Sequence, residues 1–208
     1  TQRYYLVVDS EYVITSAFSV AVDIVPGQIC VPGGATCTAG VLSMCDASGS
    51  IFASASCANG CGNATACAAN PVINDSCSTA TPISASTVIL DSYGRYTNTL
   101  NPGNACAKQS APGREGVYAV SLTQGSVLTA NVVASDPTTN PSLYLITDCA
   151  NAAGTCLAGA ASLTPEVKLQ YVATTTGLVY LVADNDWATD DDAFYLDIKI
   201  QTPECTPG

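Results

Sequence analysis

GLVYLVAD at residues 177–184 and AFYLDIKI at residues 193–200 are the two stretches that most directly predict the fold. Both are rich in β-branched and aromatic residues, and the second alternates apolar with polar side chains, which is the pattern of a half-buried strand. Two closely similar stretches stand near the N-terminus, YYLVVD at residues 4–9 and AFSVAVDI at residues 17–24. The sequence therefore predicts two related β-hairpins, one at each end of the chain.

A Cys-x-Pro-Gly motif follows each hairpin, so three blocks recur in the same order. The matching pairs, at offsets of 175, 176 and 175 residues, are Tyr5 and Tyr180, Phe18 and Phe194, and Cys30 and Cys205. Strands alone can look alike through shared composition, but a Cys-x-Pro-Gly match is not a strand feature. The nearly constant offset indicates an internal repeat.

The repeat predicts four segments. Residues 1–24 are the last hairpin of a preceding or neighbouring sandwich, 25–77 a cysteine-rich connector, 78–200 a complete sandwich, and 201–208 the start of the next connector. An isolated hairpin is marginally stable in water. We therefore expect the first hairpin to complete the sheet of a neighbouring copy, within one polypeptide or by strand addition between subunits. The predicted strand-donating residues are Tyr5, Leu6, Val7, Phe18, Val20 and Val22.

Short strands separated by turn signals fill the second half of the chain. They are predicted at 87–91, 116–122, 127–134, 142–147, 168–173, 177–183 and 193–200, with no helix long enough to matter. Two further short strands are predicted in the connector, at 41–44 and 50–53. The predicted fold class is all-β, a jelly-roll/Greek-key-like β-sandwich plus a small disulfide-rich module.

Eleven cysteines and no histidine indicate disulfides formed in an oxidising compartment. The alternative, thiolate zinc sites, normally needs two close cysteine pairs or a Cys/His mixture, and only Cys57 and Cys61 are closely spaced. The connector is poor in aliphatic residues, so disulfides must supply its stability. The ten cysteines expected to pair are Cys30, Cys37, Cys45, Cys57, Cys61, Cys67, Cys77, Cys106, Cys149 and Cys156.

The formal charge of −11 argues against nucleic acid or an anionic membrane as a partner. Only 11% of the residues are charged, which suits a weakly charged extracellular surface. No apolar run is long enough to span a membrane. We therefore expect an extracellular or cell-surface protein without nucleic-acid binding or membrane insertion.

Residues 116–128, 141–149 and 177–184, taken in this order, resemble the bacterial pre-peptidase C-terminal domain. That resemblance covers about 76–200 and again 1–24, and it implies a jelly-roll-like sandwich appended to secreted proteins. The cysteine spacing from Cys30 to Cys67, followed by NDSC at 74–77, is similar to connectors in large surface proteins of myxobacteria-like bacteria. No protease domain is present, so the resemblance implies architecture and location more than activity.

Cysteine counting agrees with this resemblance. Six cysteines between 30 and 67 can form three bridges in fifteen connectivities. Cys149 is expected to pair with Cys156, and Cys77 with Cys106. Cys205 is then left over, and as the equivalent of Cys30 it should pair beyond Gly208. The alternative is a free, reactive thiol.

The sequence predicts no catalytic machinery. Histidine-based triads are excluded, and neither a nucleophile elbow nor a phosphate-binding loop is present. The one acidic cluster contains Asp184, Asp186, Asp190 and Asp192, and its oxygen ligands make calcium the one candidate cofactor. A solvated acidic loop is the simpler interpretation, since the spacing is not that of an EF-hand. A pair of glycosidase carboxylates is disfavoured, because aromatic sugar platforms are missing around the loop.

Trp187 and several tyrosines could line a carbohydrate site, but tyrosines in strands more often pack on a sheet with a hydrated hydroxyl. These tyrosines are Tyr93, Tyr96, Tyr118, Tyr144, Tyr171 and Tyr180. The favoured function is a structural repeat unit of an extracellular filament, stalk or long surface adhesin, joined head to tail to copies of itself by strand sharing and disulfides. The alternative is an accessory module of a secreted hydrolase, binding carbohydrate or depending on calcium.

Overall fold

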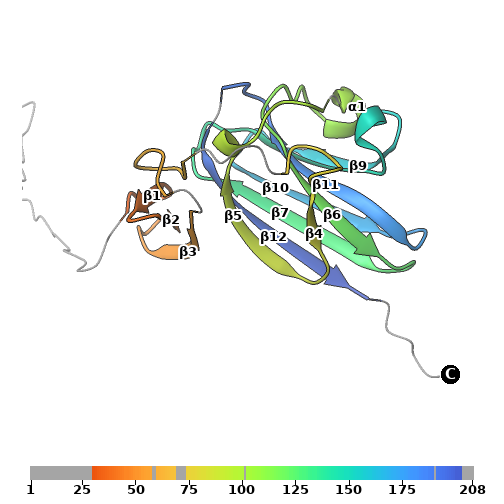
Figure 1. Ribbon diagram of the computed structural model, residues 1–208, viewed down its shortest axis with the longest axis horizontal. Coiled ribbons are helices and arrows are strands. Elements are labelled where there is room, and N and C mark those ends of the chain that lie inside the picture. The colour runs from red at the N-terminus through yellow and green to blue at the C-terminus, as the bar shows by residue number, and fades with distance from the viewer. Residues whose placement is uncertain (1–29, 58–59, 69–73, 101, 190, 203–208) are drawn as a thin grey trace, which may run out of the picture.

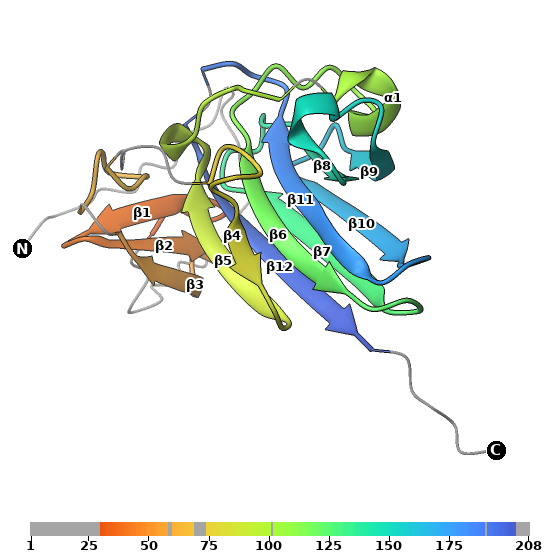
Figure 2. The same ribbon diagram turned by 45° about the vertical axis from the view of Figure 1, so that its right-hand side comes forward.

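The two stretches at 177–184 and 193–200 form β11 (Gly177–Asn185) and β12 (Ala193–Gln201) in the computed structural model. The structure describes residues 30–57, 60–68, 74–100, 102–189 and 191–202. Figures 1 and 2 show a small sheet beside a larger sandwich. The small sheet has three strands, and the sandwich consists of two sheets. The hairpin predicted at 1–24, with its strand-donating residues, lies outside the described residues.

The sandwich consists of a four-stranded sheet in the order β10-β7-β12-β5 and a five-stranded sheet in the order β4-β6-β11-β8-β9. All neighbours are antiparallel except β4 and β6, which are parallel. The remaining strands are β4 (Thr81–Ile83), β5 (Thr87–Ser92), β6 (Gly116–Leu122), β7 (Val127–Ala134), β8 (Pro141–Ile146), β9 (Cys156–Ala161) and β10 (Glu166–Val172).

Successive strands of the sandwich alternate between the two sheets from β4 to β12, except at the β8–β9 hairpin. As a result β11 and β12, although last in sequence, lie inside their sheets. β11 pairs with β6 and β8, and β12 pairs with β5 and β7. The hairpin predicted at 177–200 is therefore wrong: β11 and β12 do not pair with each other, and each is instead a central strand of a different sheet, because the chain crosses from one layer to the other between them.

The main core lies between the two sheets and follows the period-2 pattern of the strands. In β7 each even-numbered residue from Leu128 to Ala134 is buried, while the residues between them are half-buried. The ring of Phe194 packs against Tyr93 at a centroid distance of 4.6 Å. The alternation that predicted half-buried strands thus places their apolar faces in this core.

A second core covers the outer face of the five-stranded sheet. The one-turn helix α1 (Gly103–Ala107) and the segment before it pack over β8, so that all six residues of β8 are buried. The sequence predicted no helix long enough to matter, and α1 is a single turn. A helix of one turn has too few residues for a periodic pattern, and α1 ends at Lys108, whose φ of 67° cannot continue it.

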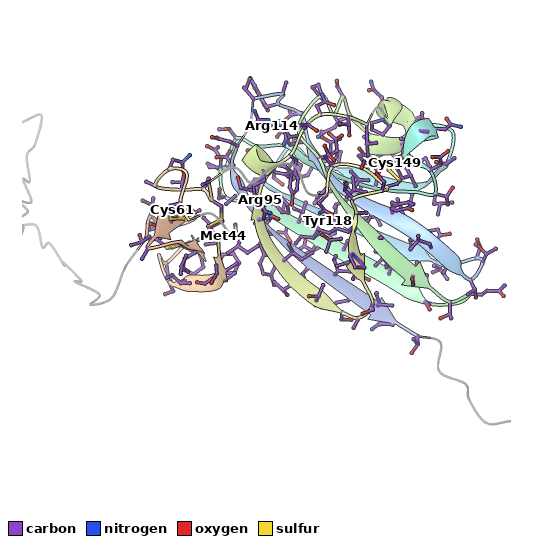
Figure 3. All side chains as sticks on the ribbon, in the orientation of Figure 1. Met44, Cys61, Arg95, Arg114, Tyr118 and Cys149 are labelled. Atoms are coloured by element: carbon purple, nitrogen blue, oxygen red, sulfur yellow. A yellow bond between two sulfur atoms is a disulfide. The ribbon has the colours of Figure 1, made fainter. Side chains whose placement is uncertain are left out.

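The cysteine-rich module consists of β1 (Ala35–Thr38), β2 (Val41–Cys45) and β3 (Ile51–Ser56) in one antiparallel sheet. Its small core, built on Leu42 and Met44, also contacts Ala193, Leu90 and Tyr195 of the sandwich. The ring of Phe52 lies edge-on to Tyr195 at 5.4 Å. Figure 3 shows Met44 and Cys61 on the module, and Arg95 and Tyr118 on the sandwich. The module therefore packs against the outer face of β12 and β5.

Five disulfides join the described cysteines. Three lie within the module, Cys30–Cys45, Cys37–Cys61 and Cys57–Cys67. The other two are Cys77–Cys149 and Cys106–Cys156. The expected pairs Cys77–Cys106 and Cys149–Cys156 were wrong, because α1 lies over β8 and β9 and brings distant segments together. Cys205 lies outside the described residues.

The seven strands predicted in the sandwich are all present, whereas β4 and β9 were not predicted. β9 reads CLAGAA, which has no β-branched residue. At Gly159 in this strand, a Cβ would collide with the backbone carbonyl of Cys106. Close packing against α1, held by the Cys106–Cys156 bridge, therefore determines β9 in place of strand propensity.

Replacing both Cys106 and Cys156 by Ser should lower the free energy of unfolding of the sandwich by about 2–4 kcal/mol, because the bridge closes a long loop and fixes α1. Urea unfolding under oxidising conditions, followed by Trp187 fluorescence, measures this. As a matched control, the same exchange at Cys37 and Cys61 of the module should change the sandwich transition less. A loss below about 1 kcal/mol for the first variant would contradict this role.

Candidate functional site

A shallow hollow opens where the β7–β8 loop meets the β11–β12 loop. Its volume is about 240 Å³, and a neighbouring hollow of about 520 Å³ shares Asp192 with it. The first is lined by Thr138, Thr139, Trp187, Thr189 and Asp192. The second is lined by Val31, Pro32, Gly33, Gly34, Ala35 and Thr65 of the module and by Ser135, Asp136, Pro137 and Asp192 of the sandwich. We call the two together the seam groove, since the second lies at the contact between module and sandwich and the first adjoins it at Asp192.

Hydrogen bonds between the two loops hold the seam groove in shape. Asn140 donates from Nδ2 to Asp186 at 2.7 Å, and the Thr139 hydroxyl donates to Asp192 Oδ2 at 3.0 Å. Within the first loop, Thr138 donates to Asp136 Oδ1 from its backbone N–H at 2.7 Å and from its hydroxyl at 2.6 Å. Local side-chain bonds of this kind are typical of Asx and Ser/Thr turns.

Trp187 lies at one end of the seam groove with 60% of its surface exposed. Its backbone N–H donates to Oδ1 of the fully buried Asn185 at 2.9 Å. Trp187 is the only tryptophan of the chain. The backbone that carries this exposed indole is therefore fixed by a buried residue two positions earlier, at the end of β11.

The aspartates predicted as calcium ligands have separate partners. Asp184 is fully buried and accepts from the Tyr144 hydroxyl at 3.0 Å, whereas Asp186 and Asp192 bond Asn140 and Thr139 in the loops. Among the described residues, no group of three or more acidic, cysteine or histidine side chains is arranged to hold a metal ion. Asp190 lies outside the described residues, and the calcium hypothesis remains a prediction.

Two buried carboxyl groups stand close to each other near the same end of the sandwich. Glu115 is fully buried, and its Oε1 accepts from the Thr99 N–H at 2.5 Å, the Thr99 hydroxyl at 2.8 Å and the Leu100 N–H at 2.6 Å. Its Oε2 has no hydrogen-bond partner in the described part of the chain. Burial raises the pKa of Glu115 to about 7, against the hydrogen bonds from Thr99 and Leu100.

Asp184 shows the same effect. Burial, and then repulsion by the charge of Glu115, raises the pKa of Asp184 well above its ordinary value, while the bonds from Asn185 and Tyr144 oppose the rise. Buried carboxyl groups with a raised pKa take up protons more readily in the folded state than in the unfolded chain. These two groups therefore make the fold sensitive to pH.

In a third polar cluster, around Asp91, the buried charge is paired with an opposite charge and with hydrogen-bond donors. Asp91 accepts from Arg95 at 2.7 Å and from the Tyr96 hydroxyl at 2.5 Å, and the hydroxyls of Tyr96 and Tyr118 lie 3.4 Å apart. Burial raises the pKa of both tyrosines. Each charged group here has an opposite charge or a hydrogen-bond partner, which indicates a structural role.

The predicted packing of the tyrosines is confirmed for Tyr93, Tyr96, Tyr118 and Tyr144, which are at most 3% exposed. Their hydroxyls, however, are not hydrated: those of Tyr96 and Tyr144 bond buried aspartates. Sequence reasoning missed Glu115 and the threonines of the seam groove. The residue pair Asp136-Pro137 is typical of a turn and does not by itself indicate a site, and a single glutamate before a strand carries no pattern that predicts burial.

No protein-family model matches this sequence, and no curated protein matches it. Among solved structures the chain is similar to the pre-peptidase C-terminal domain of collagenase from Bacillus anthracis, with 15% identity, a TM-score of 0.39, and coverage of 58% of this chain and 94% of that one. It is also similar to CorA, a surface-associated copper-binding protein of Methylomicrobium album BG8, with 6% identity, a TM-score of 0.37, and coverage of 58% and 98%.

Likenesses at this level assign neither a family nor a function. A pre-peptidase C-terminal domain is thus one of the structures that the chain is similar to, as the sequence resemblance implied. The cysteine-rich connector and the myxobacterial setting have no counterpart in these comparisons. The strands, sheets and bridges themselves define an all-β sandwich with a disulfide-rich module. In the described part of the chain no helix has the length and apolarity needed to cross a bilayer.

Folding stability should fall as the pH rises from about 4.5 to 8. The pKa of Glu115 is 4.5 in the unfolded reference and about 7 in the fold, so the folded state holds the extra proton in this window. This difference between the two pKa values corresponds to a decrease of roughly 3 kcal/mol at most in the free energy of unfolding. Glu115→Gln should reduce the fall, and Asp184 should account for what remains. Urea unfolding at pH 5 and pH 8 gives the free energy of unfolding of the parent protein and of Glu115→Gln. EDTA is present so that no divalent cation neutralises the carboxylates.

Glu166→Gln is the matched control, because Glu166 forms an exposed ion pair with Lys168 on β10. It should leave the fall with pH in place. An equal fall in the parent protein and in Glu115→Gln would show that this buried carboxyl does not cause it.

Proposed function

We propose that this chain is a non-catalytic structural repeat unit of an extracellular filament, stalk or long surface adhesin, joined head to tail to further copies. The observation that carries the proposal is the recurrence of three sequence blocks at offsets of 175, 176 and 175 residues. Five disulfides in the described residues favour an oxidising, extracellular setting.

The positions of β11 and β12 support this interpretation. Tyr180 and Phe194, the equivalents of Tyr5 and Phe18, lie in strands that are paired on both sides within their sheets. A segment with the same sequence pattern is thus suited to the middle of a sandwich and not to a free edge. This favours a preceding sandwich in the same polypeptide over strand addition between separate subunits.

The end of the sandwich where the chain leaves β12 offers a contact surface for the next unit. Gln201 and Val172 lie in one row across the sheet, since both are in register with Val127. At the same end Leu157, Tyr171 and Leu178 help to line a hollow of about 90 Å³ that opens toward the core. Leu157 and Leu178 are 40% and 49% exposed.

The short segment between Gln201 and Cys205 is consistent with a contact between this end of the sandwich and the following module. Cys205, the equivalent of Cys30, follows Gln201 by four residues, which span at most about 14 Å. The following module would therefore begin next to the hollow. The described module carries exposed apolar side chains that lie away from the seam groove and are suited to cover this hollow, at Val41 and Ile51. We infer that each module packs against its own sandwich through β12 and against the end of the preceding one.

Negative-stain microscopy of native material tests the proposal. Ordered filaments whose axial repeat matches one sandwich plus one module are expected. Monodisperse single units would overturn it.

Leu178→Asp, introduced in the repeats, should disorder or shorten these filaments, because it places a charge in the proposed contact. Leu163→Asp is the matched control. Leu163 is 84% exposed and lies in the β9–β10 connection, at the opposite end of β10 from Val172. If the Leu178→Asp filaments keep their length and order, the proposed end contact is wrong. The repeat itself is tested separately, by the microscopy of the native protein.

A further inference from the structure

The exposed tryptophan has no role in the fold or in the proposed contact between repeats. An indole that is 60% exposed keeps a large apolar surface in water, and such surfaces in soluble proteins commonly mark binding sites. The bond from the Trp187 N–H to buried Asn185 fixes the backbone that carries the ring. Little conformational freedom of the backbone at Trp187 would be lost on binding a ligand.

The side chains around the indole are hydroxyls and a carboxylate. Thr138 and Thr189 are exposed beside it, and Asp192 forms the wall toward the second hollow. Hydroxyls both donate and accept, whereas the carboxylate accepts. Neither hollow has a lysine or arginine in its lining. A flat apolar platform flanked by such groups matches a pyranose, which has an apolar C–H face and a rim of hydroxyls.

The seam groove is longer than one sugar. Its two hollows, of about 240 and 520 Å³, meet at Asp192, and the second continues between Pro32 of the module and Pro137 of the sandwich. Ligand sites commonly lie at such contacts between domains, with mostly apolar walls and a few polar groups. The groove therefore has room for several linked units.

The negative charge of the chain and of the groove wall disfavours anionic ligands. The chain has a formal charge of −11, and Asp136 and Asp192 are both in the wall. Polyanions such as polyuronates and nucleic acids would be repelled. Uncharged sugars meet no such barrier.

We propose that the seam groove binds a neutral oligosaccharide, with one pyranose ring stacked on Trp187 and its hydroxyls bonded to Asp192 and the neighbouring threonines. This site adds ligand recognition to the structural role proposed above and does not depend on it. A repeated chain would present one such site per unit, so that weak single sites would sum to strong attachment to a polysaccharide surface.

The single tryptophan gives a direct readout. Titration with hexaoses of β-1,4-glucose, β-1,4-N-acetylglucosamine, β-1,4-xylose and β-1,4-mannose should change the intrinsic fluorescence of Trp187 for at least one of them. Isothermal titration calorimetry then gives the affinity. Trp187→Ala should weaken binding by about tenfold or more, as expected for an aromatic anchor. Asp192→Asn should weaken it less, and Leu178→Ala at the other end of the sandwich should leave it unchanged.

Circular dichroism and thermal unfolding of Trp187→Ala establish that the variant is folded. The proposal is overturned if none of the four hexaoses changes the fluorescence, or if Trp187→Ala binds as tightly as the parent. Binding of oligolysine alone would also overturn it, by identifying a merely acidic surface. Filaments of Trp187→Ala should form normally, which separates this site from the repeat contact.

Discussion

The two faces of β12 have different partners, and the arrangement of the whole chain depends on them. Phe194, Leu196 and Ile198 point into the sandwich core, whereas Ala193 and Tyr195 pack against the cysteine-rich module. A shift of one residue in register would exchange the two faces. Pairing with β5 and β7 on either side prevents such a shift. Because Asp192 immediately precedes β12, the same constraint places the seam groove between module and sandwich.

The two parts of the chain are stabilised in different ways. The sandwich buries a large apolar core between its sheets, which is the usual source of stability in a domain of this size. The module has little apolar material beyond Leu42 and Met44, and three bridges constrain its unfolded chain instead. A chain built this way resists unfolding without many charged surface groups, which suits the low charged content of the sequence.

Strand propensity and alternation were sufficient to predict seven strands of the sandwich, because those strands are half-buried and regular. The same rules could not find β9, whose small residues are ordered by α1 and a disulfide. Disulfide partners depend on which loops meet in space, so Cys77 and Cys106 were paired wrongly. Trp187 was noticed as a candidate for carbohydrate, but its neighbours Thr138 and Thr139 come from a distant loop that no local pattern connects to it.

The central claim, that the chain repeats a sandwich plus a module, is tested most directly at Cys205. Cys30 bonds Cys45, fifteen residues further along. Peptide mass spectrometry of native material under non-reducing conditions should therefore find Cys205 bonded to a cysteine fifteen residues beyond it, in a peptide that resembles β2. A free thiol at Cys205, or a bond from it to one of the ten cysteines paired in the described fold, would contradict the account.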